Sequence, residues 1–137
     1  MPRSVGFGLT FATLLIAMLA VAQQAGPAAA PSWAAPPAES DKKNPLPAEA
    51  KTVAQGQKVA QSNCVSCHGA RGKGDGVAAV ALNPKPADWT SKKVQGESDG
   101  EIFWKITTGH NAMPSWKHLP EQDRWALVRY IRSLGGK

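Results

Sequence analysis

The residues with the clearest capacity for chemistry lie in the segment SNCVSCHGARGKGDG, residues 62–76. It contains both cysteines of the chain, Cys64 and Cys67, and His68 follows the second directly. Thiol and imidazole side chains can ligate a metal ion, exchange electrons as a dithiol, act as nucleophiles or attach a cofactor covalently. The choice among these depends on the spacing and on the elements around the segment.

Four interpretations of Cys64-x-x-Cys67-His68 compete. A structural zinc ion needs four ligands, but the motif supplies at most three, and His110 and His118 have no paired spacing. A thioredoxin-like dithiol belongs to a βαβ unit, which the flanks do not contain. A disulfide across so short a loop would constrain little of the chain. The spacing is instead that of a c-type haem, in which two thiols bond to the porphyrin vinyl groups and the histidine ligates the iron.

Three helices are predicted around this motif. Residues 49–63 combine good helix formers with an apolar side and lead straight into the first cysteine. Residues 98–109 begin with Ser98 and Glu101 in capping-box spacing and end at a glycine suited to positive φ. Residues 120–136 begin with proline and acids and carry apolar residues at i, i+1, i+4 and i+7. Since no alternating strand pattern follows residue 49, we expect an all-α domain.

The N-terminus has the features of an export signal. An uncharged apolar run follows Arg3, and an A-x-A cleavage pattern ends at Ala22. We expect residues 1–22 to be either a cleaved signal peptide or an uncleaved membrane anchor, and both place the remainder in the periplasm or on the outer face of the cytoplasmic membrane. No cysteine lies near the site to carry a lipid. Residues 23–48 are rich in proline and alanine, which predicts a flexible linker before a domain at 49–137.

On these residues the chain resembles the class I c-type cytochromes, particularly the short bacterial proteins with a single haem. The resemblance covers residues 56–134 and is carried by Gly56 and Val59, the Cys64–Gly69 motif, the loop GARGKGDG, the segment AMPSW, and Leu127, Tyr130 and Ile131. It implies a small cytochrome c fold of three or more helices wrapped around one covalently bound haem c. It further implies that the first and last helices cross where Gly56 lets the backbones approach and Tyr130 packs. The family commonly has an aromatic residue at Ala60, so we expect Trp125 to fill the crossing here.

The sixth ligand of the haem iron is to be chosen among Met113, His110 and His118. Met113 lies in a loop and precedes Pro114, which favours an extended conformation there. The other two methionines lie in the export segment. We therefore expect His68 and Met113 as the axial pair, with His110 as the alternative. A thioether ligand raises the reduction potential above that of a bis-histidine haem.

Further residues have an expected role around the haem. The glycine-rich run 72–76 has the composition of a phosphate-binding loop but lacks the preceding strand, so close passage of the backbone near the ring is the better explanation. The resemblance suggests that the carbonyl of Pro84 accepts a hydrogen bond from His68 Nδ1, the alternative being an ordinary turn. Trp89 or Trp116 is expected to donate to a haem propionate, although tryptophans in so small a domain are first of all core residues.

The net charge and the lack of other catalytic residues restrict the possible classes of function. The chain has 16 Lys and Arg against 10 Asp and Glu, a formal net charge of +6. These basic residues are scattered, unlike a nucleic-acid site, and favour redox partner proteins with acidic docking surfaces. We expect a monomeric one-electron carrier in a respiratory or dehydrogenase chain, and not an enzyme by itself. The alternatives are a dedicated cytochrome subunit of an exported dehydrogenase or oxidase complex and a ligand-binding haem sensor.

Overall fold

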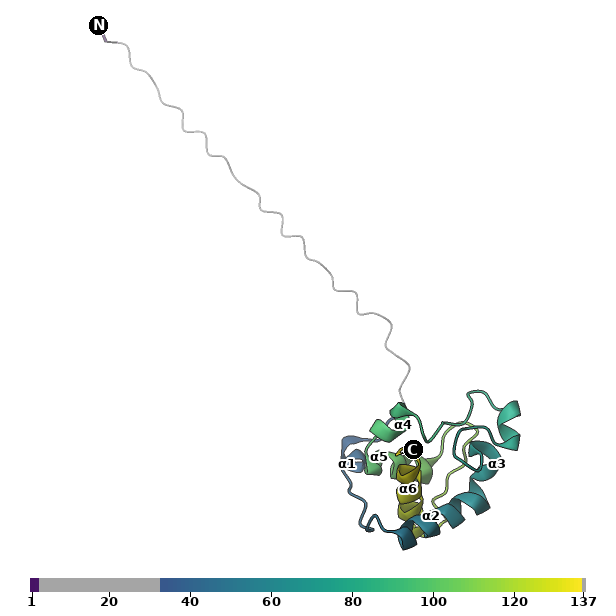
Figure 1. Ribbon diagram of the computed structural model, residues 1–137. Coiled ribbons are helices and arrows are strands. Elements are labelled where there is room, and N and C mark those ends of the chain that lie inside the picture. The colour runs from purple at the N-terminus through teal and green to yellow at the C-terminus, as the bar shows by residue number, and fades with distance from the viewer. Residues whose placement is uncertain (3–32, 137) are drawn as a thin grey trace. The chain divides into compact units, whose positions relative to one another are not determined.

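The computed structural model describes residues 33–136, together with Met1 and Pro2 at the start of the chain (Figure 1). Its helices are α1 (Pro37–Ser40), α2 (Ala50–Asn63), α3 (Val65–His68), the 3-10 helix η1 (Val77–Ala81), α4 (Lys92–Gly96), α5 (Asp99–Thr108) and α6 (Glu121–Leu134). Within these described residues no strand forms apart from one isolated bridge, so the all-α prediction is confirmed. The predicted signal peptide lies outside the described residues except for its first two.

The three predicted helices are α2, α5 and α6. Ser98 caps α5 by accepting a hydrogen bond from the amide of Glu101 at 3.1 Å, and Gly109 ends it with φ of 66°. Pro120 precedes the first turn of α6, where the acids stabilise the helix N-terminus. The short helices α1, α3, α4 and η1 were not predicted, because one turn is too short for a periodic apolar pattern.

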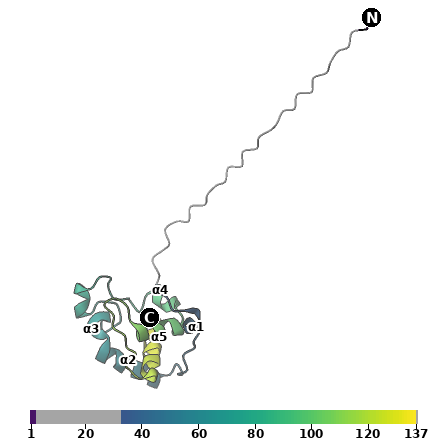
Figure 2. The ribbon, with the colours of Figure 1, turned by 180° about the vertical axis from the view of Figure 1, so that it is seen from behind.

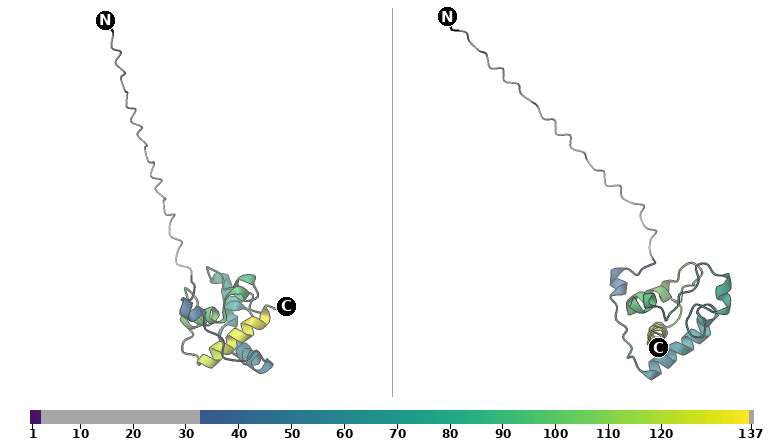
Figure 3. Two further views of the ribbon diagram at one scale, coloured as in Figure 1. Left: turned by 90° about the vertical axis from the view of Figure 1, so that its left-hand side faces the viewer. Right: turned by 45° about the horizontal axis from the view of Figure 1, so that its top comes forward.

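The crossing of α2 and α6 organises the domain (Figure 3). A Cβ atom added to Gly56 would lie 2.9 Å from Tyr130 Cβ and closer still to the backbone of Ala126. The expected close approach at Gly56 is therefore confirmed, because only glycine leaves room for the α6 backbone at this point.

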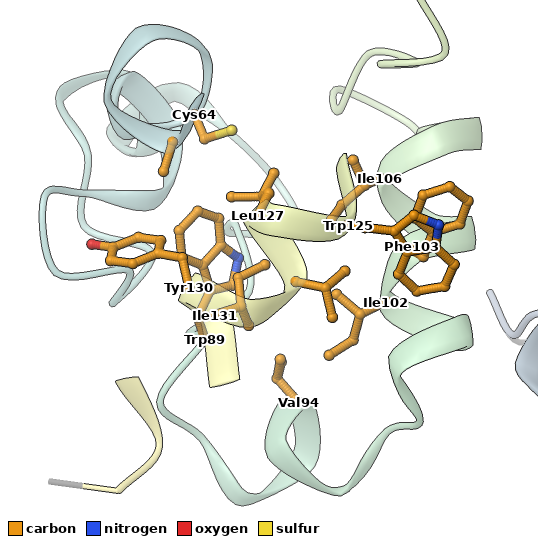
Figure 4. Packing of buried hydrophobic residues seen from close by; sticks show 12 residues of the cluster. Cys64, Trp89, Val94, Ile102, Phe103, Ile106, Trp125, Leu127, Tyr130 and Ile131 are labelled. Carbon is orange, nitrogen blue, oxygen red and sulfur yellow. The ribbon is translucent and has the colours of Figure 1, made fainter. Parts of the chain in front are cut away.

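The expectation that Trp125 fills this crossing is wrong. The Trp125 ring stacks on Phe103 of α5 with centroids 3.8 Å apart and planes at 11° (Figure 4). Consecutive residues of a helix point about 100° apart, so a helix that turns Ala126 toward α2 directs Trp125 elsewhere. On the other side of the core, Tyr130 meets Trp89 edge-on.

The hydrophobic core lies among α2, α4, α5 and α6, and Leu127, Val128 and Ile131 of α6 are its largest fully buried side chains. Burial of these apolar side chains is the main stabilising contribution of α6. Among the residues that the structure describes, no helix is both long and apolar enough to traverse a bilayer.

Residues 33–48, here called the strap, pack on the domain, whereas the sequence predicted a flexible linker there. Arg129 of α6 donates two hydrogen bonds to the carbonyl of Leu46, at 2.6 and 2.8 Å. Asn44 Nδ2 donates to the carbonyl of Trp125 at 3.0 Å, and α1 lies beside α5 (Figure 2). The composition of the strap does not predict this packing. Side chains of the domain bind backbone carbonyls of the strap, and such contacts require no periodic apolar residues in the strap itself. Residues 23–32 of the predicted linker lie outside the described residues.

Candidate functional site

The cysteine motif forms one helical turn directly after α2. The amide of Cys64 closes α2 on the carbonyl of Ala60 at 2.8 Å, and the amides of Cys67 and His68 then bond to the Cys64 carbonyl at 3.1 and 2.9 Å. Both thiols are free, Cys64 buried and Cys67 half-buried. Burial, and secondarily the neighbouring Cys67, raises the pKa of the Cys64 thiol to about 11. The Cys64 thiol is therefore neutral at neutral pH.

The imidazole of His68 is buried and oriented. Its Nδ1 lies 3.0 Å from the carbonyl oxygen of Ala87, and its ring stacks on Trp89 with centroids 4.6 Å apart and planes at 23°. Burial lowers the pKa of His68, and the Ala87 carbonyl partly opposes this shift. A neutral imidazole that donates from Nδ1 presents the lone pair of Nε2 as a ligand.

The partner of His68 is Ala87, and the expectation that Pro84 supplies this carbonyl is wrong. The amide of Trp89 donates to the carbonyl of Gly72 at 2.7 Å, which folds the chain back beside the cysteine motif. This bond brings the residues just before Trp89, and with them the Ala87 carbonyl, to the imidazole. Pro84 is exposed and lies three residues before Ala87 in the chain.

The glycine-rich loop uses its amides on the cysteine motif. Gly74 donates to the carbonyl of His68 at 2.8 Å, and Gly76 donates to that of Cys67 at 3.0 Å. A Cβ atom on Gly72, whose φ is 70°, would lie 2.6 Å from the Trp89 ring. The loop therefore completes the C-terminal end of α3 and makes room for Trp89, and these two amides are not free to bind a phosphate.

Met113 lies in a tight loop after α5. The amide of His110 donates to the carbonyl of Met113, and the amide of Met113 donates to the carbonyl of His110, both at 2.9 Å. Asn111 between them has φ of 52°. Met113 is half-buried against the core cluster, whereas His110 and His118 are exposed. Of the three candidates for the sixth ligand, Met113 is the side chain packed toward the core.

Neither predicted propionate donor is shown in that role. Trp89 is 7% exposed and packs against the rings of His68 and Tyr130. This is the core role that the sequence offered as the alternative to a propionate contact. Trp116 is half-buried, and its ring lies 5.5 Å from that of His118. The propionate contact stays a prediction for both.

The donor set fits a c-type haem. Two free thiols are one turn apart, and the buried histidine beside them has one nitrogen bonded to the protein and the other left for a metal. Nowhere in the described part of the chain do three or more His, Cys, Asp or Glu side chains group to hold a bare metal ion. Sequence reasoning missed Ala87 here, since every residue has a backbone carbonyl and the sequence does not indicate which one will meet His68.

The fold is all-α, the cysteine motif follows the first long helix, and the loop with Met113 precedes the last helix. This arrangement defines a class I c-type cytochrome, a protein with one haem c covalently bound. The family model described as cytochrome c oxidase, cbb3-type, subunit III matches residues 51–131, and the chain belongs to this family.

Similar proteins agree with this class. The cbb3-type cytochrome c oxidase subunit FixP of Rhizobium meliloti is 34% identical over 92 residues, which cover 66% of this chain and 30% of that protein. Cytochrome c6 of Cladophora glomerata is 31% identical over 85 residues, covering 61% of this chain and 89% of that protein. A solved structure of the reducing HAO-like protein complex of Kuenenia stuttgartiensis matches with TM-score 0.59 and 35% identity, over 66% of this chain and 46% of that one. The chain thus spans about a third of the FixP length.

Proposed function

We propose that the protein is an exported one-electron carrier whose haem c is attached through Cys64 and Cys67 and has His68 and Met113 as axial ligands. The observation that carries this proposal is the orientation of His68, whose Nδ1 is bound to the Ala87 carbonyl one turn from two free thiols. A bound haem c supplies an iron that gains or loses one electron.

The chain's own residues have distinct tasks in this proposal. The Ala87 carbonyl holds the His68 proton on Nδ1 and makes Nε2 a stronger ligand, as such partners of ligating histidines do. Met113 is presented by a loop held by two backbone hydrogen bonds to His110. If His68 and Met113 both ligate the iron, no position would be left for a substrate, which favours electron transfer over ligand sensing.

Electron exchange needs a contact surface beside the attached haem. The 3-10 helix η1 exposes Val77 and Val80, at 84% and 82%. It packs on α3 and follows the hydrogen bond from Gly76 to the Cys67 carbonyl, so the two valines adjoin the proposed attachment site. Lys85 Nζ donates to the carbonyl of Ala79 at 2.7 Å and holds η1 in place.

The partner proposed for this surface is a redox protein with an apolar patch rimmed by acidic residues. The net charge of +6 and the exposed Lys85 beside the valines support this charge preference. Encounter is then steered electrostatically and remains transient. Export to the periplasm, or anchoring on the outer face of the membrane, rests on the apolar run that follows Arg3.

A dedicated subunit of an oxidase or dehydrogenase complex is the second candidate. The similarity to FixP favours it, since that protein is named as an oxidase subunit. A carrier purifies alone and exchanges electrons more slowly as salt increases, whereas a subunit co-purifies with a larger protein and is insensitive to salt.

The test is the mass and visible spectrum of the full chain purified from the exported fraction. We expect one covalently bound haem, a low-spin six-coordinate spectrum in the oxidised state and a mature N-terminus at Gln23. A haem that acid and organic solvent extract, or a five-coordinate spectrum, would contradict the proposal.

A further inference from the structure

The strap is fastened to the domain at several points before it reaches the site. Ser98 Oγ donates to the carbonyl of Ser40 at 2.6 Å, and Arg129 holds the Leu46 carbonyl. A Cβ atom on Gly100 of α5 would lie 2.9 Å from the Lys42 carbonyl and closer to that of Glu39, so the strap backbone lies directly on α5. These contacts fix the path of the strap and bring its first described residue, Trp33, to the end of α5.

Trp33 packs against the methionine loop. Its ring stacks on the imidazole of His110 with centroids 5.1 Å apart and planes at 17°. Lys105 Nζ lies 5.4 Å from the centroid of the Trp33 ring, and Glu97 and Glu101 hold that ammonium at 2.6 and 2.9 Å. The strap therefore contacts the loop through an aromatic face and a cation placed by two carboxylates.

The indole nitrogen of Trp33 is buried and has no hydrogen-bond partner among the described residues. No polar anchor of the indole therefore contributes to its position, and the ring is held through its faces. A phenyl ring could keep the stack on His110, whereas a methyl group could not.

His110 connects this stack to Met113. The two residues exchange both backbone hydrogen bonds at 2.9 Å, so a displacement of the His110 backbone moves that of Met113. On the far side of the loop, the amide of Trp116 donates to the carbonyl of Ile106 at 3.1 Å, which ties the chain to α5 again. On the near side, Trp33 stacks on the exposed His110.

We propose that Trp33 is a positioning residue for the proposed iron ligand Met113, because its stack on His110 holds the methionine loop closed. The inference rests on the proposed function, in which Met113 ligates the iron. Cleavage after Ala22 would leave Trp33 in the mature protein, so the strap belongs to the working form of the cytochrome. Opening of the loop is a local event whose frequency decides how often an external ligand can reach the iron.

The experiment compares Trp33→Ala, Trp33→Phe and Lys42→Ala in the mature holoprotein. Lys42 is an exposed strap residue whose ammonium pairs with Glu39 and takes no part in the stack, so it serves as the matched control. Two quantities are measured: the rate constant for imidazole binding to the oxidised protein, and the temperature at which the thioether-to-iron absorption band is lost relative to the loss of helix. We expect Trp33→Ala to bind imidazole on the order of threefold to tenfold faster, as expected for the loss of one aromatic pair. Its band should be lost well below the temperature at which helices unfold.

Trp33→Phe and Lys42→Ala should stay within about twofold of the wild-type rate, since the stack survives in both. A wild-type rate in Trp33→Ala would overturn the proposal. A Trp33→Phe protein that binds imidazole as fast as Trp33→Ala would also overturn it. So would loss of the absorption band in Trp33→Ala only at the temperature at which the helices unfold, because Trp33 would then stabilise the whole domain and not the loop. Met113→Ala is the reference: if it keeps the wild-type band, the ligand assignment fails, and the positioning role of Trp33 fails with it.

Discussion

Replacing Gly56 by alanine should destabilise the protein, although alanine is the better helix former. The added Cβ would lie 2.5 Å from the Ala126 carbonyl carbon and 2.9 Å from Tyr130 Cβ, and the first of these is backbone that no side-chain rotation can move. Separating α2 from α6 costs up to about 3 kcal/mol as overpacking. Helix propensity returns about 1 kcal/mol. The net loss is up to about 2 kcal/mol, and a loss of that size lowers the melting temperature of so small a domain by about 8–16 °C.

Gly96→Ala is the matched control for this prediction. Gly96 ends α4, and a Cβ atom there would meet nothing within 4 Å. Its melting temperature should stay unchanged or rise slightly. Thermal unfolding of the oxidised holoproteins, followed by far-UV circular dichroism, measures both. If Gly56→Ala melted at or above the wild-type temperature, the α2 and α6 backbones would not be in obligatory contact, and the proposed organisation of the core would be refuted.

Three further predictions concern the proposed site. Met113→Ala should lose the thioether band, lower the reduction potential and bind carbon monoxide readily when reduced, whereas His110→Ala should keep the band; the reverse pattern in visible spectra and potentiometry would make His110 the ligand. Cys64→Ala and Cys67→Ala should each retain haem less firmly under denaturing extraction, and the double variant should fail to fold, since a small domain would lack its largest apolar insert; a dispersed NMR spectrum of the haem-free double variant would argue otherwise. Electron transfer to an acidic redox protein should slow as ionic strength rises, because the screening length shrinks from about 10 Å at 0.1 M, and Val80→Asp should slow it further at constant salt; rates indifferent to both changes would point to a different surface or a permanent complex.

The similarity to oxidase subunits and to the much shorter cytochrome c6 leaves two proposed modes of action, which differ in the lifetime of the complex with the redox partner. FixP is about three times longer than the matched region, whereas cytochrome c6 is nearly all matched. The chain has the domain that both share. Whether it works as a mobile carrier or as a fixed subunit is therefore decided by its partner surface, which makes the salt dependence the informative measurement.

The sequence by itself determined what depends on short-range chemistry. The spacing of Cys64, Cys67 and His68 allows few cofactors, the apolar periods predicted α2, α5 and α6, and Gly56 marked the close approach to α6 through the family resemblance. The cysteine motif and the helices depend on residues within a few turns of one another, so local patterns suffice to reveal them, whereas the approach at Gly56 joins distant residues and was inferred only through the resemblance.

Only the tertiary structure decided which distant groups meet. The carbonyl beside His68 belongs to Ala87 because a hydrogen bond from Trp89 folds the loop back, and every residue has such a carbonyl. Trp125 faces Phe103 because its neighbour on α6 faces α2. Residues 33–48 pack on the domain because Arg129 binds the Leu46 carbonyl, and a periodic pattern of apolar residues does not predict such a contact. Backbone groups are chemically alike along the chain, so the sequence cannot tell which of them a side chain will bind until the fold has placed both.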